Sequence, residues 1–69
     1  MNRIPVSSSN ISSVGFDTDT QTLEIEFTNG NIYQYFDVPF TIYEELMQAE
    51  SKGQFLSTQI KGVYRYARL

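Results

Sequence analysis

A short segment of strict alternation most constrains the fold of this 69-residue chain. From residue 22 to residue 27, apolar side chains alternate with polar ones, which is the two-residue period of a strand with one buried face. The apolar members are Leu23, Ile25 and Phe27. Asn29-Gly30 follows and supplies the positive-φ residues that a tight hairpin requires. We therefore expect residues 32–36 to return as an antiparallel partner strand.

Weaker patterns extend this hairpin on both sides. Residues 10–16 resemble a strand that Gly15 interrupts, where the glycine marks a bulge or a close backbone approach. After Pro39 the apolar period becomes helical, and Thr41 with Glu44 three residues later matches a capping box. This pattern predicts that a helix begins at Thr41.

Two glycines divide the C-terminal third. Gly53 is expected to end the first helix, and a second short helix is expected from residue 54 or 55 to residue 61. Gly62 is placed to close that helix with a left-handed residue. The tail, residues 63–69, is predicted to be extended or coil.

These elements predict an α+β fold with two layers. A three-stranded antiparallel meander is followed by two short helices that pack on one face of the sheet. The Ser-rich residues 1–9 are expected to form a flexible N-terminal arm, as chain ends often do. Residues 10–69 are expected to form one domain, because so short a chain supports one core.

Composition removes several classes of function. The chain has no cysteine and no histidine, so disulfides, thiolate chemistry and the commonest general base and metal ligand are all absent. We expect neither an enzyme nor a bound metal or cofactor. No apolar run is long enough for a signal peptide or a membrane span, so a cytoplasmic protein is expected by default.

Charge is segregated along the chain, although the net charge is only −3. All eight acidic residues lie in residues 1–50, where Arg3 is the single cation. The charged side chains of residues 51–69 are all cations, namely Lys52, Lys61, Arg65 and Arg68. This asymmetry favours an anionic partner or an acidic surface of the same molecule. Lys52 also has a structural interpretation, because a lysine in the last turn of a helix stabilises the helix dipole.

Two Tyr-x-Tyr pairs accompany these charges, Tyr33 with Tyr35 and Tyr64 with Tyr66. Exposed rings at this spacing on one strand face form a stacking platform for unpaired bases, and a nearby arginine adds cation–π and phosphate contacts. Buried rings would belong to the core instead. For Tyr64 and Tyr66 the two interpretations are equally balanced.

The hairpin register decides the environment of Tyr33 and Tyr35. A two-residue turn would pair Ile25 with Gln34 and place both rings on the face that carries Glu24 and Glu26. A three-residue turn would pair Ile25 with Tyr33 and direct both rings into the core, because a slip of one residue exchanges the faces. We favour the core placement, since a thin core needs aromatic residues, and both registers stay open.

The basic tail likewise has two interpretations. A phosphate-rich partner would satisfy Lys61, Arg65 and Arg68 together. Alternatively, the tail could lie across the face of the sheet that carries Glu24 and Glu26 and neutralise it.

Several short motifs together resemble a known family. They are Leu23-x-Ile25-x-Phe27-x-Asn29-Gly30-x-x-Tyr33-x-Tyr35, Val38-Pro39, Ala49-x-Ser51-Lys52-Gly53, Ile60 and Tyr64. In order and spacing, the chain from about residue 8 to residue 69 is similar to the KTSC domain. That module occurs at the C-terminus of some lysyl-tRNA synthetases and as a stand-alone protein of bacteria and phages, an association that implies RNA binding.

The resulting hypothesis is a non-catalytic module that binds RNA, either tRNA or single-stranded RNA, through its basic aromatic C-terminal segment. The candidate contacts are Tyr33, Tyr35, Lys52, Lys61, Tyr64, Arg65, Tyr66 and Arg68. The alternative is a module for protein–protein interaction, such as a homodimer, that uses an edge strand or an exposed aromatic face.

Overall fold

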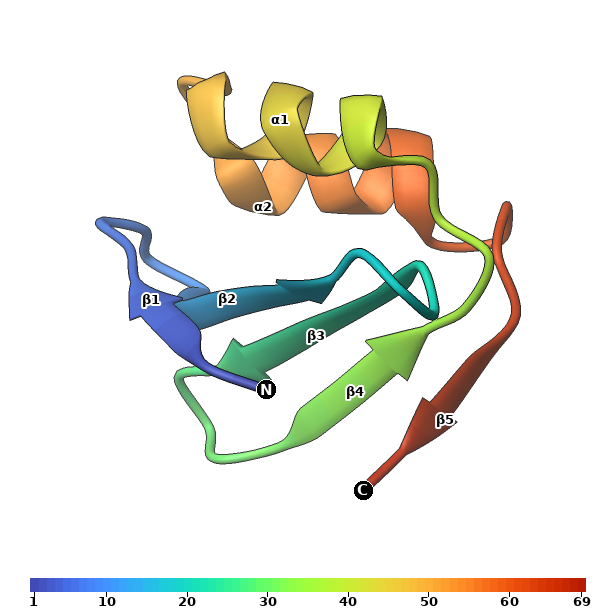
Figure 1. Cartoon of the computed structure of the whole chain (residues 1–69). Coiled ribbons are helices and arrows are strands. Elements are labelled where there is room, and N and C mark those ends of the chain that lie inside the picture. Colours follow the sequence, from blue (N-terminus) through green and yellow to red (C-terminus); the bar gives the residue numbers. More distant parts are fainter.

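Five antiparallel strands form a single sheet (Figure 1), in the spatial order β1-β2-β3-β4-β5. The computed structural model describes all residues, 1–69. The strands are β1 (Arg3–Pro5), β2 (Ile11–Asp17), β3 (Thr22–Phe27), β4 (Ile32–Tyr35) and β5 (Tyr66–Arg68). The predicted meander is confirmed as β2 to β4, but the predicted number of three strands is wrong. Both chain ends, predicted as a flexible arm and as an extended or coil tail, contribute an edge strand.

The β3–β4 hairpin has the three-residue turn. Leu23 pairs with Tyr35 and Ile25 with Tyr33. Gly30 has a φ of +92°, a left-handed conformation that glycine adopts without strain. The Phe27 amide donates to the carbonyl oxygen of Asn31 at 2.8 Å and closes the loop. Both tyrosines of β4 therefore lie on the same face as the apolar residues of β3.

Two helical segments cover that face (Figure 1), as the sequence predicts. The first is α1 (Phe40–Gln48), and the second is α2 (Lys52–Phe55), which continues as the π-helical segment η1 (Leu56–Ile60). The predicted capping box is wrong, because α1 begins directly after the extended Pro39 and Thr41 lies inside it. Pro39 is the N-cap residue and supplies no side-chain cap, but its carbonyl oxygen accepts a hydrogen bond from the Ile42 amide at 3.0 Å.

The second helix begins earlier than the sequence predicts. Gly53 lies inside α2 and does not end α1, which stops where the backbone becomes extended at Ala49. The Ser51 hydroxyl accepts a hydrogen bond from the Gln54 amide at 3.3 Å and caps the new helix. Gly62 does adopt the predicted left-handed conformation, with a φ of +78°.

The core lies between the helices and the sheet. Its members are fully or almost fully buried apolar residues from β2, β3, β4, the β4–α1 connection and the helices. They are Ile11, Val14, Leu23, Ile25, Tyr35, Val38, Leu46, Leu56 and Ile60. Phe16, Phe27 and Tyr33 pack against this cluster from the same sheet face.

The opposite face of the sheet holds the two β3 carboxylates. The guanidinium of Arg3 in β1 lies 2.7 Å from a carboxylate oxygen of Glu24, and Gln34 donates to the other oxygen at 2.9 Å. Ser13 donates to Glu26 at 2.9 Å. The alternative in which the basic tail neutralises this face is therefore wrong: Arg3 of the edge strand β1 pairs with Glu24, while β5 lies at the opposite edge beside β4.

Candidate functional site

Three tyrosines meet where β4 pairs with β5. Tyr35 lies directly opposite Tyr66, and Tyr33 lies two residues from Tyr35 on the same face. The ring centroids of Tyr33 and Tyr66 are 5.8 Å apart, and those of Tyr35 and Tyr66 are 6.0 Å apart. Tyr33 and Tyr35 stack at 6.4 Å. We refer to Tyr33, Tyr35 and Tyr66 as the tyrosine cluster.

Exposure increases across this cluster towards the edge of the sheet. Tyr35 is 2% exposed and belongs to the core, Tyr33 is half-buried, and Tyr66 is 61% exposed. The cluster therefore extends from the core to the surface of the molecule. Its inner rings hold the position of an outer ring that a ligand can reach.

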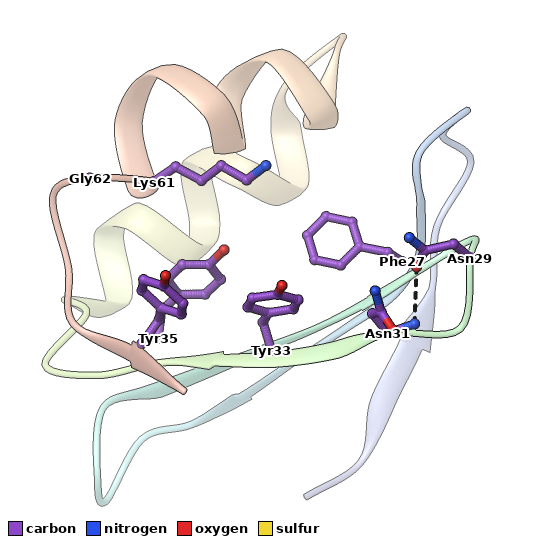
Figure 2. Close-up of a pocket in the computed structure, with 8 residues that line it drawn as sticks. Phe27, Asn29, Asn31, Tyr33, Tyr35, Lys61 and Gly62 are labelled. Carbon is purple, nitrogen blue, oxygen red and sulfur yellow. Dashed lines mark hydrogen bonds between the residues drawn. The ribbon is translucent and has the colours of Figure 1, made fainter. Parts of the chain in front are cut away.

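A recess of about 530 Å³ opens over the cluster (Figure 2), a volume typical of small-molecule sites. It is lined by Phe27, Asn29, Asn31, Tyr33, Tyr35, Lys61, Gly62 and Tyr66. Lys61 reaches over it from the end of the second helix, while the tyrosines rise from the sheet below (Figure 2). The Lys61 ammonium lies 5.8 Å from the centroid of the Phe27 ring. We call this the tyrosine recess.

The hairpin loop forms the polar end of the tyrosine recess. The Asn31 backbone amide donates to the side-chain oxygen of Asn29 at 3.0 Å. Arg68 of β5 donates to the side-chain oxygen of Asn31 at 3.1 Å, which places a guanidinium beside this end. Sequence analysis missed Phe27 and both asparagines as candidate contacts. The sequence did contain a signal for the asparagines, because two amide side chains flank the turn glycine Gly30.

Burial raises the pKa of the Tyr35 hydroxyl above its ordinary value of 10.0, and the adjacent Tyr33 and Tyr66 raise it further. The hydroxyl therefore stays neutral near pH 7. A neutral phenol can both donate and accept a hydrogen bond. The tyrosine recess thus offers a ligand aromatic surfaces, phenolic hydroxyl groups, two amides and one ammonium.

The other candidate residues lie outside this recess. Arg65 pairs with Asp37 at 2.8 Å and lies over the Phe36 ring at 5.6 Å. Tyr64 is half-buried and packs against the core. Lys52 lies at the start of α2, in a separate polar recess, and donates to the Ala49 carbonyl at the end of α1 at 3.2 Å. Lys52 therefore does not lie in the last turn of the first helix, as its structural interpretation expected, but its ammonium does contact the C-terminal end of α1.

Two further features complete the description. No group of three or more metal-ligating side chains comes together in the structure. Neither helix combines the length and the apolar character needed to cross a membrane.

Comparisons with known proteins place these features in a family. A model of the KTSC domain matches residues 7–64. The crystal structure of a KTSC domain protein from Yersinia pestis is similar over 99% of this chain and 96% of that chain, with a TM-score of 0.93 and 43% sequence identity.

Sequence relatives are of two kinds. An uncharacterized protein of Stutzerimonas stutzeri is 37% identical over 70 residues, which cover 100% of this chain and 99% of that protein. A lysine–tRNA ligase of Nostoc sp. is 48% identical over 59 residues, which cover 86% of this chain but 10% of the ligase. The chain therefore spans about a tenth of the length of the ligases it matches. On the family match and these relatives, the chain belongs to the KTSC domain family.

Proposed function

We propose that this domain is a non-catalytic module that binds single-stranded segments of RNA at the tyrosine recess. One unpaired base stacks on Tyr66, and the flanking phosphates contact Lys61 and Arg68. The observation that carries the proposal is the exposed Tyr66 ring, which packs against Tyr33 and Tyr35. It shares the tyrosine recess with Lys61 and the strand β5 with Arg68. Stacking of bases on aromatic side chains beside cations is the usual mode of single-strand binding.

Local charge supports this placement, although the whole chain is acidic. No carboxylate is among the residues that line the tyrosine recess. The negative charges of β3 lie on the opposite face, where Arg3 pairs with Glu24. A polyanion can therefore approach β5 without facing a carboxylate in the recess, and the charge segregation of the sequence becomes a separation in space.

The relatives suggest which RNA to test first. A segment similar to this chain occurs in lysine–tRNA ligases, whose name states that they act on tRNA. The single-stranded loops and the 3′ end of tRNA provide unpaired bases, which are the usual targets of sequence-tolerant aromatic platforms. We therefore take tRNA and a short single-stranded RNA as the two probes.

A titration of labelled RNA followed by fluorescence anisotropy tests the proposal at two salt concentrations. Two phosphate contacts on a single strand predict a slope of log K against log salt of about −1.4. Lys61→Gln should weaken binding and make the slope less negative by about 0.7 to 1. Lys52→Gln is the matched control, because Lys52 lies in a different recess, and it should leave both quantities near wild type.

A second pair of variants tests the stacking contact. Tyr66→Ala should reduce affinity by about 1 to 3 kcal/mol, the usual contribution of one stacked base. Phe40→Ala removes another exposed aromatic ring, 47% exposed at the start of α1, and should not change affinity. Binding that is insensitive to salt, or a Tyr66→Ala protein that binds like wild type, would contradict the proposal.

A protein–protein role is the second candidate, because β5 is an edge strand with exposed apolar neighbours. Val63 is 62% exposed and Leu69 is 66% exposed on either side of it. Such an edge can pair with a second copy of the chain. Sedimentation at several protein concentrations measures this directly: a mass that rises with concentration supports a homodimer, and a constant monomer mass contradicts it.

A further inference from the structure

Hydrogen bonds within the hairpin loop determine how its two amide side chains face a ligand. Asn29 accepts from the backbone N–H of Asn31, and Asn31 accepts from the guanidinium of Arg68. Both partners are groups that can only donate, so the atom that each asparagine directs at its partner must be the amide oxygen. Each oxygen thus has one of its two lone pairs engaged within the protein, whereas neither NH₂ group has a hydrogen-bond partner in the structure.

The polar end of the tyrosine recess is therefore rich in free hydrogen-bond donors, the NH₂ groups of the two asparagines. Both asparagines line it, and Figure 2 shows them at the end away from Gly62, with Lys61 extending above the rings. The Lys61 ammonium also donates and cannot accept. The tyrosine hydroxyls can do either, and no carboxylate lines the recess. A ligand whose polar edge carries acceptors is thus the better match.

We propose that the tyrosine recess prefers guanine to adenine, an inference that rests on the proposed RNA binding. Guanine presents two adjacent acceptors, O6 and N7, whereas adenine presents the N6 amino donor beside N7. An asparagine usually recognises adenine with its oxygen and its nitrogen together, and here each oxygen is directed at a donor of the protein itself. An adenine amino group would face the NH₂ groups and leave donors unpaired.

Seven-nucleotide RNAs with one central purine among uridines test this preference. Three probes carry guanine, adenine or hypoxanthine at the centre, and their affinities are compared by anisotropy. Hypoxanthine keeps O6 and N7 of guanine but lacks its 2-amino group, so it isolates the edge in question. We expect guanine and hypoxanthine to bind similarly, and about fivefold or more tighter than adenine.

Asn29→Asp is the variant that changes the polar end with the smallest change in shape. The aspartate keeps an oxygen for the Asn31 amide and replaces the NH₂ donor with an acceptor, which suits the adenine amino group. We expect the guanine-to-adenine affinity ratio to fall to one or below. Thr28→Asp adds the same charge at an exposed neighbouring position outside the recess, and it should weaken all three probes equally and keep the ratio.

The outcomes separate this inference from the function on which it rests. Equal affinity for the three probes, or hypoxanthine that binds like adenine, overturns the guanine preference while RNA binding stands. An unchanged ratio in Asn29→Asp also overturns it. If no probe binds and tRNA does not bind, RNA binding itself fails, and the preference fails with it.

Discussion

Tyr35 links the core to the tyrosine recess, and its ionisation should therefore affect folding. The residue is 2% exposed, and an ionised phenolate there would lose hydration and lie beside the rings of Tyr33 and Tyr66. These are the physical reasons why its pKa is raised, burial being the larger. The unfolded chain has no such environment and loses this proton near pH 10.

The free energy of unfolding should consequently fall as pH rises above about 10. In that range the folded state keeps a proton that the unfolded state has lost, so the folded state binds more protons and each rise in pH favours unfolding. Urea unfolding at pH 7 and at several values above pH 10 measures the decline. It should be smaller in Tyr35→Phe than in wild type, whereas Tyr43→Phe, a change in α1 outside the cluster, should keep the wild-type decline.

The sequence could identify several residues of the tyrosine recess as candidate contacts, but it could not predict that they lie close together. Tyr33 and Tyr35 were candidates as a Tyr-x-Tyr pair on one strand face, and Lys61 and Tyr66 because cations and tyrosines gather near the C-terminus. Their proximity depends on β5 pairing with β4 in one register, with Tyr66 opposite Tyr35. Nothing in a three-residue strand specifies that register. Four candidate contacts do not line the recess, namely Lys52, Tyr64, Arg65 and Arg68, of which Arg68 lies beside its polar end.

At the scale of elements, one ion pair and one close backbone approach add to the backbone pairing that joins β1 to β2. Arg3 pairs with Glu24, which is only 8% exposed. Gly15 of β2 lies opposite Arg3, and a Cβ added to it would be 2.9 Å from the Asn2 carbonyl oxygen. The absence of a side chain at residue 15 therefore lets β1 approach. The sequence predicted a bulge or a close approach there, and the structure shows the close approach.

Arg3→Ala should destabilise the domain by about 1.5 to 3 kcal/mol, because the buried Glu24 carboxylate loses its charged partner. Arg65→Ala is the matched control. It removes an arginine whose ion pair with Asp37 is largely exposed, with side chains 76% and 72% accessible, so it should cost less than about 1 kcal/mol. Urea unfolding of both variants measures the difference, and equal losses would show that Arg3 does not anchor β1.

Element prediction succeeded where a pattern was long enough to repeat. The alternation in β3 and the Asn29-Gly30 turn correctly predicted a hairpin, and only its register needed the structure. Strands β1 and β5 have three residues each, too few for a period of two to stand out. Helix ends were less predictable, because Pro39 and Ser51 start the two helices where Thr41 and Gly53 offered competing signals.

At the scale of the whole molecule, the exposed acidic residues around α1 and the cations around β5 lie in different places. Exposed acidic residues Glu44, Glu45 and Glu50 lie on or just after α1 in the helical layer. Cations Lys61, Arg65 and Arg68 lie in and around the β5 edge. The molecule should therefore orient a polyanion towards the tyrosine recess before contact, which a net charge of −3 alone would not suggest.

The whole fold depends on a core of nine side chains, so one core truncation should be severe. A domain of this length is expected to have a stability of about 3 to 10 kcal/mol. Leu46→Ala, at a fully buried position of α1, should remove about 2 to 5 kcal/mol and lower the Tm by about 10 °C or more. Leu69→Ala, at a position 66% exposed, should change Tm by only a few degrees, about 4 °C at most. Thermal unfolding followed by circular dichroism compares the two variants, and similar Tm losses would show that Leu46 is not part of a single shared core.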